Sequence, residues 1–344
     1  MKRPLPAARY DGMTVSPLFS LTPVAACLLW GVSPAGAGDE IRNPLTPRNF
    51  PDPYILTVKD SVFAFATNSR ASHVQVMRSA DWLNWEPMPD ALPQLPPWAG
   101  PGKTWAPEVA AVDGGYVLYF TAHDRKSGRQ AVGAAFAKSP SGPFADQAAT
   151  PLICQADAGG SIDASPFTDP GGTRWLLWKN DGNAIRQKTW IWIQRLSRDG
   201  LHLEGSPKPV IQNDAAWEGH VVEAPTLLMR GKTCYLFYSG GNFADGTYAV
   251  GCATAPSLTG PWKKCAANPI LRSAGPVSGP GHQHVFADSA GQWWMCYHAW
   301  ETGKEGPGHG KRTFRMDRLT FAEDGTPRIT PTLTAQPAPA RPRP

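Results

Sequence analysis

The sequence predicts an all-β fold, specifically a five-bladed β-propeller with four antiparallel strands per blade and an active site in the central channel. Its apolar runs are short, roughly four to eight residues, and none keeps the i, i+3, i+4, i+7 spacing of an amphipathic helix. The 344 residues include 34 Gly and 36 Pro, which is typical of many short strands joined by tight turns. A repeat of about 59 residues then favours a propeller over other all-β folds.

The repeat is carried by a serine that is followed by a turn and, in most copies, by an aromatic residue. These serines are separated by 60, 58 and 60 residues, at Ser79, Ser139, Ser197 and Ser257. The starts of the strands repeat with spacings of 53, 58, 60 and 59 residues, at Asp52, Trp105, Asp163, Glu223 and His282. Five such units fill residues 45–332, and four short strands per unit match blades repeated around an axis. A β-helix has a much shorter period, and a sandwich would not repeat so regularly.

The first strand of each propeller blade lines the central channel, so the five strand-start residues should converge on the axis. They comprise three carboxylates, one aromatic ring and one imidazole. Each could simply form hydrogen bonds at its strand start, but three carboxylates at one phase of the repeat favour a site. Crowded carboxylates raise the pKa of at least one of them, which places a protonated acid beside an ionised base, as glycosidic bond cleavage requires. The same trio could instead hold a hard cation through oxygen ligands.

Glu223 opens an apolar hairpin, and an unpaired carboxylate at the start of a buried strand is costly unless it has a role. Glu218, five residues earlier, is a rival acid, but it lies in the approach loop and outside the strand phase. We expect it to line the pocket with Trp217 and His220. Glu108 faces either substrate or a structural hydrogen bond, and both alternatives stay open.

Several segments form an ordered set of motifs along the chain. They are Phe50-Pro-Asp-Pro-Tyr, Thr104-Trp-Ala-Pro-Glu, Ser161-Ile-Asp-Ala-Ser-Pro, Val222-Glu-Ala-Pro, Gly279-Pro-Gly-His and the single residue Arg312. In this order, and over nearly the whole chain after residue 37, the set resembles the family-43 glycoside hydrolases, which are five-bladed propellers. Any one motif alone would be weak, but together they are specific.

The resemblance implies hydrolysis by single displacement with inversion at the anomeric carbon. Asp52 would deprotonate a water molecule, Glu223 would protonate the leaving oxygen, and Asp163 would raise the pKa of Glu223 and position it. This mechanism predicts base and acid carboxyl groups roughly 6.5–9.5 Å apart, whereas about 5 Å would indicate a retaining mechanism with Asp52 as nucleophile.

The resemblance also implies how substrate is held. The predicted substrate-binding residues are Trp105, Trp217, His220, His282 and Arg312. His282 faces the channel, where family members often hold a calcium ion or a water, so water-mediated calcium is the one cofactor that we predict.

The predicted substrate is a terminal pentofuranosyl or pentopyranosyl residue of plant-type polysaccharides or oligosaccharides. The first expectation is an α-L-arabinofuranosidase, and the alternatives are a β-xylosidase, an endo-arabinanase and a galactofuranosidase, because loops at the channel mouth set specificity. Exo and endo action both stay open. A non-catalytic sugar-binding propeller would lack the acid or the base, and both are present here.

Residues 1–37 have the pattern of a secretory signal peptide: basic residues, an apolar stretch and small residues up to Ala37. Cys27 lies in a segment like a lipoprotein box, but the apolar residues after it argue against a lipid anchor. We therefore expect a secreted or periplasmic protein. No other stretch approaches the roughly 18 apolar residues of a membrane span.

Charge and cysteine content constrain the remaining chain. The leader holds three basic residues and one acidic residue, so its removal changes the net charge from +5 to +3, too balanced to favour nucleic acid as a partner. A carbohydrate is the predicted partner, and the oligomeric state is not predicted.

An odd number of cysteines leaves at least one thiol free, with Cys234–Cys252 and Cys252–Cys265 as alternative disulfides. The cysteines after the leader are Cys154, Cys234, Cys252, Cys265 and Cys296.

The predicted domain organisation is a signal peptide over residues 1–37, a catalytic propeller over residues 38–332 and a Pro-rich disordered tail over residues 333–344.

Overall fold

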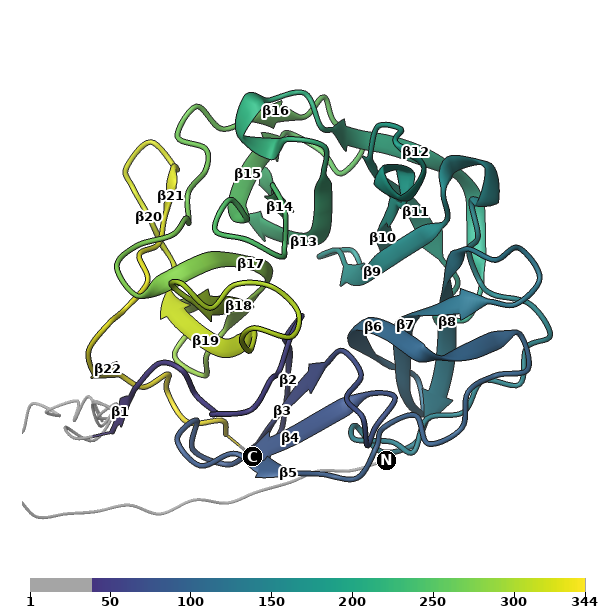
Figure 1. Ribbon diagram of the computed structural model, residues 1–344, viewed down its shortest axis with the longest axis horizontal. Helices are drawn as coiled ribbons and strands as arrows, with labels where there is room; N and C mark the ends of the chain where they lie inside the picture. Colours follow the sequence, from purple (N-terminus) through teal and green to yellow (C-terminus); the bar gives the residue numbers. More distant parts are fainter. Residues whose placement is uncertain (1–38, 344) are drawn as a thin grey trace, which may run out of the picture. The chain divides into compact units, whose positions relative to one another are not determined.

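The computed structural model describes residues 39–343, so the predicted signal peptide lies outside the described residues. This part of the chain is almost entirely β and forms five antiparallel sheets arranged as the blades of a propeller (Figure 1). The only helical turns in it are three short 3-10 segments, at Ala156–Ala158, Gly182–Ile185 and Ala216–Glu218. Among residues 39–343, no helix is long and apolar enough to cross a membrane.

The blades follow one another in chain order. The first contains β2 (Tyr54–Val58), β3 (Ser61–Ala66), β4 (Gln75–Ser79) and β5 (Glu86–Pro87). The second contains β6 (Ala99–Val112), β7 (Gly115–Asp124) and β8 (Gln130–Ala137). The third contains β9 (Ser161–Thr168), β10 (Arg174–Asn180), β11 (Trp190–Leu196) and β12 (Leu203–Gln212). The fourth contains β13 (Val222–Arg230), β14 (Thr233–Gly240), β15 (Ala249–Ala255) and β16 (Lys263–Lys264). The fifth contains β17 (Val277–Ala287), β18 (Trp293–Glu301) and β19 (Thr313–Arg318).

The second and fifth blades have three strands rather than the predicted four, because irregular chain covers their outer edges. In the second blade, the edge strand β8 makes isolated bridges to Ala145 and Ile153. In the fifth, the N-terminal segment runs beside β19, with the Leu45 N–H donating to the Phe314 carbonyl oxygen at 2.8 Å. Both edges are therefore protected without a regular fourth strand.

The C-terminal segment differs from the predicted disordered tail. Its strand β22 (Gln336–Pro337) pairs antiparallel with β1 (Glu40–Ile41) beside the fifth blade. Gln336 Nε2 also donates to the Met316 carbonyl oxygen at 2.9 Å. Proline suits an edge strand because it needs no ladder donor there, so the composition that suggested disorder also fits an extended closing segment. A further short pair, β20 (Thr320–Phe321) with β21 (Pro327–Arg328), lies outside the blades.

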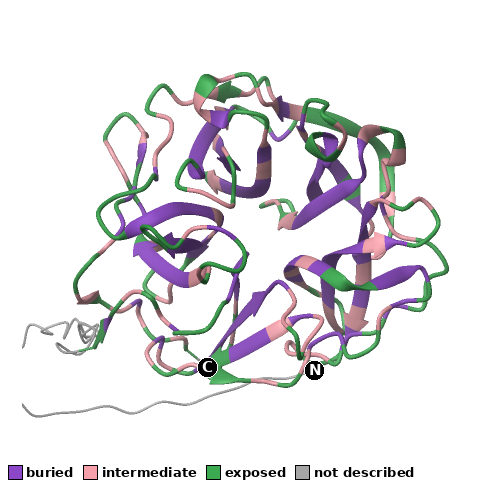
Figure 2. Ribbon diagram, viewed as in Figure 1, coloured by how far each residue is buried: buried purple, intermediate pink, exposed green. Residues whose placement is uncertain are grey.

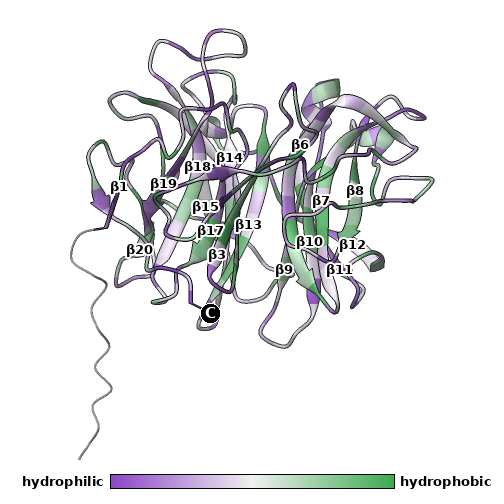
Figure 3. Cartoon of the chain, turned by 90° about the horizontal axis from the view of Figure 1, so that it is seen from below, coloured by the Kyte–Doolittle hydropathy of each residue, from purple (hydrophilic) through white to green (hydrophobic). Residues whose placement is uncertain are grey.

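The hydrophobic core is divided into five clusters, one between each pair of neighbouring blades. Successive strand residues point to opposite faces, so one strand supplies two clusters. In β7, Leu118 and Phe120 pack toward the first blade, whereas Val117 and Tyr119 pack toward the third. Figure 2 shows the buried residues concentrated in the blades and the exposed ones in the outer loops, and Figure 3 shows hydrophobic residues concentrated along the strands.

Trp82 lies in the cluster between the fifth and first blades. Its side chain is fully buried, its ring stacks on Phe286 at 5.2 Å, and its Nε1 donates to the Ala340 carbonyl oxygen at 3.1 Å. We expect Trp82→Ala to lower the free energy of unfolding by about 3–5 kcal/mol, because it opens a cavity in the hydrophobic cluster between the fifth and first blades. Urea denaturation measures this loss. Leu333→Ala, at an exposed position, is the control, and equal losses in the two variants would contradict this packing role.

The described cysteines are all free thiols. Cys234 lies opposite Ala255 and Cys252 lies opposite Phe237, so the first proposed disulfide does not match the strand register. Cys265 lies beside Cys252, with its backbone N–H donating to the Cys252 carbonyl oxygen at 2.8 Å.

Candidate active site

A cavity of about 380 Å³ is lined by side chains from all five blades. All five strand-start residues line it, as does Arg312. Trp217 and His220, also predicted to bind substrate, do not; they line an adjoining cleft. The complete lining is Asp52, Trp105, Ile162, Asp163, Lys179, Asp181, Asn183, Ala184, Glu223, Phe243, Tyr248, His282, Pro307 and Arg312.

The backbone is kinked at the inner strand of every blade, where one non-glycine residue has a positive φ. These residues are Asp52 (58°), Ala106 (45°), Asp163 (57°), Ala224 (51°) and His282 (51°). Such backbone conformations cost on the order of 1–3 kcal/mol each and cluster at functional sites. The sequence repeat is therefore one residue out of phase in two blades: Trp105 and Glu223 precede the kink residue, whereas the other three strand-start residues occupy it.

Each kink is held by a side chain of the preceding blade, which accepts a hydrogen bond from the kink residue's N–H. The acceptors are Thr67 for Ala106, Thr121 for Asp163, Ser239 for His282, His298 for Asp52 and Asp163 for Ala224. In the fourth blade the acceptor is therefore a carboxylate of the cavity. Because Ala224 follows Glu223 directly, Asp163 Oδ2, at 3.1 Å from the Ala224 nitrogen, fixes the backbone beside Glu223.

Asp52 is surrounded by nitrogen donors and a hydroxyl. Arg312 Nη1 lies 2.7 Å from Asp52 Oδ1, His282 Nδ1 lies 3.4 Å from the same oxygen, and Thr67 Oγ1 donates to Oδ2. Burial alone would raise the pKa of Asp52, but Arg312, His282 and His298 outweigh burial and hold it well below the ordinary value. Asp52 is thus an ionised carboxylate at neutral pH.

His298 supports Asp52 as a neutral ring. It is fully buried, and burial lowers its pKa to about 4 despite the neighbouring carboxylate. Its Nδ1 lies 3.1 Å from the Asp52 backbone nitrogen and 3.2 Å from Asp52 Oδ1, so the ring contacts both the backbone and the carboxylate of this residue.

Glu223 is held by two donors. Lys179 Nζ lies 2.9 Å from Oε2, and the Tyr248 hydroxyl donates to Oε1 at 2.7 Å. Lys179 is itself only 1% exposed and also lies 3.5 Å from Asp181, so one buried cation serves two carboxylates. Burial would raise the pKa of Glu223, but Lys179 and Tyr248 outweigh burial and lower it.

Asp163 has the opposite shift. Burial raises the pKa of Asp163 to about 6, with His282 opposing the rise and the negative charge of Glu223 adding to it. The repulsion between the two carboxylates acts on both, but the Lys179 ammonium has the larger effect on Glu223, so the net shift of the Glu223 pKa is downward. Asp163 and Glu223 line the same cavity and interact electrostatically, and of the two it is Asp163 whose pKa is raised.

The arrangement places an ionised carboxylate, Asp52, and a carboxyl group of raised pKa, Asp163, in the same cavity as Glu223. A carboxylate such as Asp52 can accept a proton from water. A pair such as Asp163 and Glu223 can deliver a proton to a departing oxygen, and those two functions are what glycoside hydrolysis needs.

Two other acidic residues considered from the sequence have structural contacts. Glu218 is fully buried and lines neither the central cavity nor the adjoining cleft; it pairs with Lys264 at 2.6 Å and accepts the Tyr238 hydroxyl at 2.8 Å. The prediction that Glu218 lines the pocket is therefore wrong. Its side chain is buried and accepts hydrogen bonds from the backbone N–H groups of Asp214 and Ala215 in its own loop. Glu108 accepts the Ser165 hydroxyl at 2.8 Å, and burial raises its pKa well above the ordinary value.

Two residues of the site lacked a clear sequence signal. Tyr248 precedes β15 and belongs to no repeat phase, so only the fold brings it to Glu223. Lys179 begins a polar run with the composition of a turn, Lys179-Asn-Asp-Gly-Asn, but the lysine itself lies within strand β10. The feature that could have indicated a buried, functional lysine is its position directly after the apolar run Trp175–Trp178, within the same strand.

The cavity does not fit a directly coordinated metal ion. Within residues 39–343 there is no group of three or more His, Cys, Asp or Glu side chains placed to hold one. His282 Nδ1 faces Asp52 instead. Water-mediated calcium stays a prediction, and exhaustive chelation tests it: activity lost and then restored by calcium would support it, whereas unchanged activity would contradict it.

A five-bladed propeller with carboxylates and an aromatic ring around a central cavity defines a class of protein, the propeller-fold glycoside hydrolases. The chain belongs to glycosyl hydrolases family 43, whose family model matches residues 41–327. It is 27% identical over 302 residues to the Beta-D-galactofuranosidase xynD of Aspergillus niger, covering 82% of this chain and 83% of that protein. It is 25% identical to the Extracellular exo-alpha-(1->5)-L-arabinofuranosidase of Streptomyces avermitilis, covering 86% of this chain and 64% of that longer protein. The crystal structure of a thermostable family-43 glycoside hydrolase matches with a TM-score of 0.76 and 31% identity, covering 85% of this chain and 96% of that one.

The Lys179 contact leads to a prediction about pH dependence. Because Lys179 stabilises the Glu223 carboxylate, Lys179→Met should raise the pKa of Glu223 and keep it protonated to higher pH. We expect the alkaline limb of the kcat/KM profile to move up by about one pH unit or more, as for loss of an opposite charge within hydrogen-bond distance. Lys232→Met, in the exposed turn of the β13–β14 hairpin, is the control. An alkaline limb unmoved by Lys179→Met would contradict the assignment.

Proposed function

We propose that the protein is an inverting exo-glycosidase in which Asp52 is the general base, Glu223 the general acid and Asp163 the residue that positions Glu223. The carrying observation is the asymmetry of the cavity. Arg312 and His282 contact Asp52 and keep it ionised, whereas Lys179 and Tyr248 hold Glu223 beside Asp163, whose pKa burial raises to about 6.

The proposed reaction balances within this set of residues. Water forms a bond to the anomeric carbon and gives its proton to Asp52, while the glycosidic C–O bond breaks. The leaving oxygen takes the proton of Glu223, whose new negative charge is stabilised by Lys179 and Tyr248 at 2.9 and 2.7 Å. Solvent then restores both protonation states. Trp105, His282 and Arg312 line the cavity and are the proposed contacts to the sugar.

For the substrate we propose a terminal furanosyl residue, with α-L-arabinofuranose first. The small size of the central cavity, about 380 Å³, supports recognition of a single terminal sugar. The second candidate is β-D-galactofuranose, supported by the similarity to the galactofuranosidase of Aspergillus niger. Both sugars present a five-membered ring and differ in the exocyclic group.

Nitrophenyl glycosides of arabinofuranose, galactofuranose and xylopyranose, assayed side by side, test this proposal. We expect the highest kcat/KM on the arabinofuranoside. A preference for the xylopyranoside would overturn the furanose assignment, and no hydrolysis of any of them would overturn the exo-glycosidase proposal.

We also propose a secreted or periplasmic location, supported by the leader-like N-terminus and by a relative named as extracellular.

A further inference from the structure

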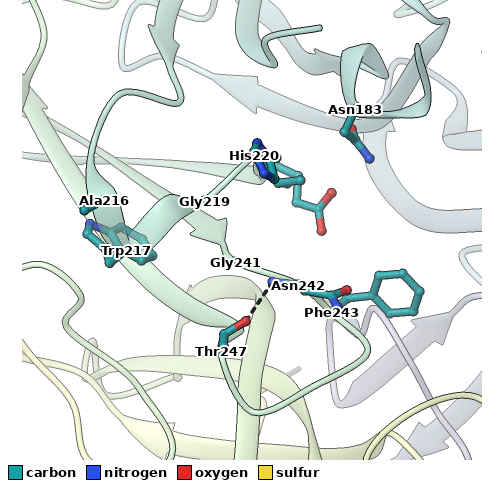
Figure 4. A pocket seen from close by; sticks show the side chains of 11 residues that line it. Asn183, Ala216, Trp217, Gly219, His220, Gly241, Asn242, Phe243 and Thr247 are labelled. Atoms are coloured by element: carbon teal, nitrogen blue, oxygen red, sulfur yellow. Dashed lines mark hydrogen bonds between the residues drawn. The ribbon is translucent and has the colours of Figure 1, made fainter. Parts of the chain in front are cut away.

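A cleft of about 750 Å³ continues outward from the central cavity, starting at Glu223. The two hollows share Asn183, Glu223 and Phe243 as lining residues. Figure 4 shows Asn183, His220 and Phe243 around the cleft, with Trp217 farther along it. Because the general acid touches the leaving oxygen, the cleft beside Glu223 lies on the leaving-group side of the scissile bond. This placement rests on the proposed function.

Phe243 is an exposed aromatic ring held in place at the junction of cavity and cleft. It is 41% exposed, and Leu333 is the one other large hydrophobic residue that the described chain exposes to such a degree. Trp300 Nε1 donates to its carbonyl oxygen at 2.7 Å, and the Arg312 guanidinium lies 5.2 Å from its ring centre. A fixed ring of this kind offers a flat apolar face to a sugar.

The loop that presents Phe243 is tied internally. Asp245 accepts hydrogen bonds from the Asn242 side chain at 2.7 Å and from the Thr247 N–H at 2.8 Å. The Asn242 N–H donates to Thr247 Oγ1, as drawn in Figure 4. Ligand binding therefore has little loop entropy to overcome.

Beyond His220 and Asn183 the cleft meets a second hollow of about 540 Å³. Among the described residues, its lining is entirely polar and contains two cations but no acid: Asn183, Arg186, Gln187, Lys188, Asn213 and His220. Arg186 and Lys188 are both exposed. The acids next to this lining in sequence already have cationic partners, since Asp181 contacts Lys179 and Asp214 contacts Lys264. The hollow is thus a cationic site without a protein counter-charge in its wall.

We propose that the cleft binds a leaving group that is an oligosaccharide carrying a uronic acid. Its first sugar stacks on Phe243 beside Glu223, and its carboxylate binds Arg186 and Lys188 in the second hollow. The charge of the hollow selects an anionic chain, while the walls of the first cleft beyond Glu223, which include Trp217 and Phe243, accept neutral rings. The enzyme would then release its terminal sugar from acidic rather than neutral polysaccharides.

The test uses matched substrates that differ only in charge. Oligosaccharides bearing the terminal sugar preferred by the enzyme and one uronic acid unit are compared with their carboxyl-reduced counterparts, in which the carboxylate has become a neutral alcohol. Glucuronate and galacturonate versions distinguish the two common sources of the carboxylate. We expect kcat/KM to be about threefold to tenfold higher for the acidic member, the range for two exposed charge pairs. The preference should weaken in 0.5 M salt, because exposed charges are screened.

Two variants separate this inference from the proposed function. In the double variant Arg186→Ala and Lys188→Ala, the ratio of acidic to reduced substrate should fall to about one, whereas Lys232→Ala should keep it. Phe243→Ala should raise KM for both oligosaccharides much more than it raises KM for the glycosyl fluoride of the same terminal sugar. In that substrate fluoride is the leaving group, so no sugar occupies the cleft. Equal rates on acidic and reduced substrates in the native protein would overturn the inference and leave the proposed function intact. No hydrolysis of either would instead count against the proposed function.

Discussion

Glu223→Gln should lower kcat/KM on a sugar leaving group by about 10²–10⁴-fold, the range for losing a general acid. Hydrolysis of the glycosyl fluoride of the same sugar should fall far less, because fluoride departs without protonation. The amide keeps the shape of Glu223 and can still accept the Tyr248 hydroxyl, which donates to the native carboxylate at 2.7 Å. Steady-state kinetics on the two substrates measure the ratio.

Glu218→Gln is the matched comparison for this variant. Glu218 is fully buried and pairs with Lys264 at 2.6 Å, so the substitution should lower stability without changing the ratio between the two substrates. If Glu223→Gln reduced activity equally on the fluoride and on the sugar leaving group, Glu223 would not be the acid.

Asp52→Asn should abolish activity on every leaving group, because an inverting enzyme must activate water whichever group departs. We expect a loss of about 10²–10⁴-fold on both the oligosaccharide and the glycosyl fluoride. The pH profile adds a second readout. Since Arg312 and His282 hold the pKa of Asp52 well below its usual range, the native acidic limb should lie below pH 3.8, the ordinary value for an aspartate.

Asp60→Asn, on the exposed turn between β2 and β3, is the control for Asp52→Asn. Full activity of Asp52→Asn on the fluoride would contradict the base assignment. An acidic limb at or above the ordinary aspartate value would show that the Arg312 and His282 contacts do not govern this carboxyl group.

The fold was largely predictable because each copy of the sequence repeat corresponds to one blade of the propeller. Each copy must bury one inner strand and supply two inter-blade clusters, so serine turns and strand starts recur at fixed spacing. The repeat did not show that Trp105 and Glu223 stand one residue before the kink, because positive φ at Ala106 and Ala224 has no signature in their side chains. The pairing of the C-terminal strand β22 with β1 could not be predicted either, because the proline content of this segment matches both disorder and an edge strand.

The candidate site was predictable where its residues share the repeat phase. Asp52, Asp163 and Glu223 belong to that set, whereas the groups that set their protonation come from other strands and loops. Lys179 lies 44 residues from Glu223, and Arg312 lies 260 residues from Asp52. The first contact joins the neighbouring third and fourth blades, and the second joins the fifth blade to the first, so charge and burial at the site required the structure.

The most direct test of the central claim, that Asp52 activates water opposite a Glu223 acid, is the configuration of the sugar at first turnover. Proton NMR of the released sugar, recorded on the preferred nitrophenyl glycoside before mutarotation, distinguishes the two anomers. Inversion is the predicted result, with the first-formed anomer opposite in configuration to the substrate. Retention would contradict the account, because it would make Asp52 a nucleophile rather than a base.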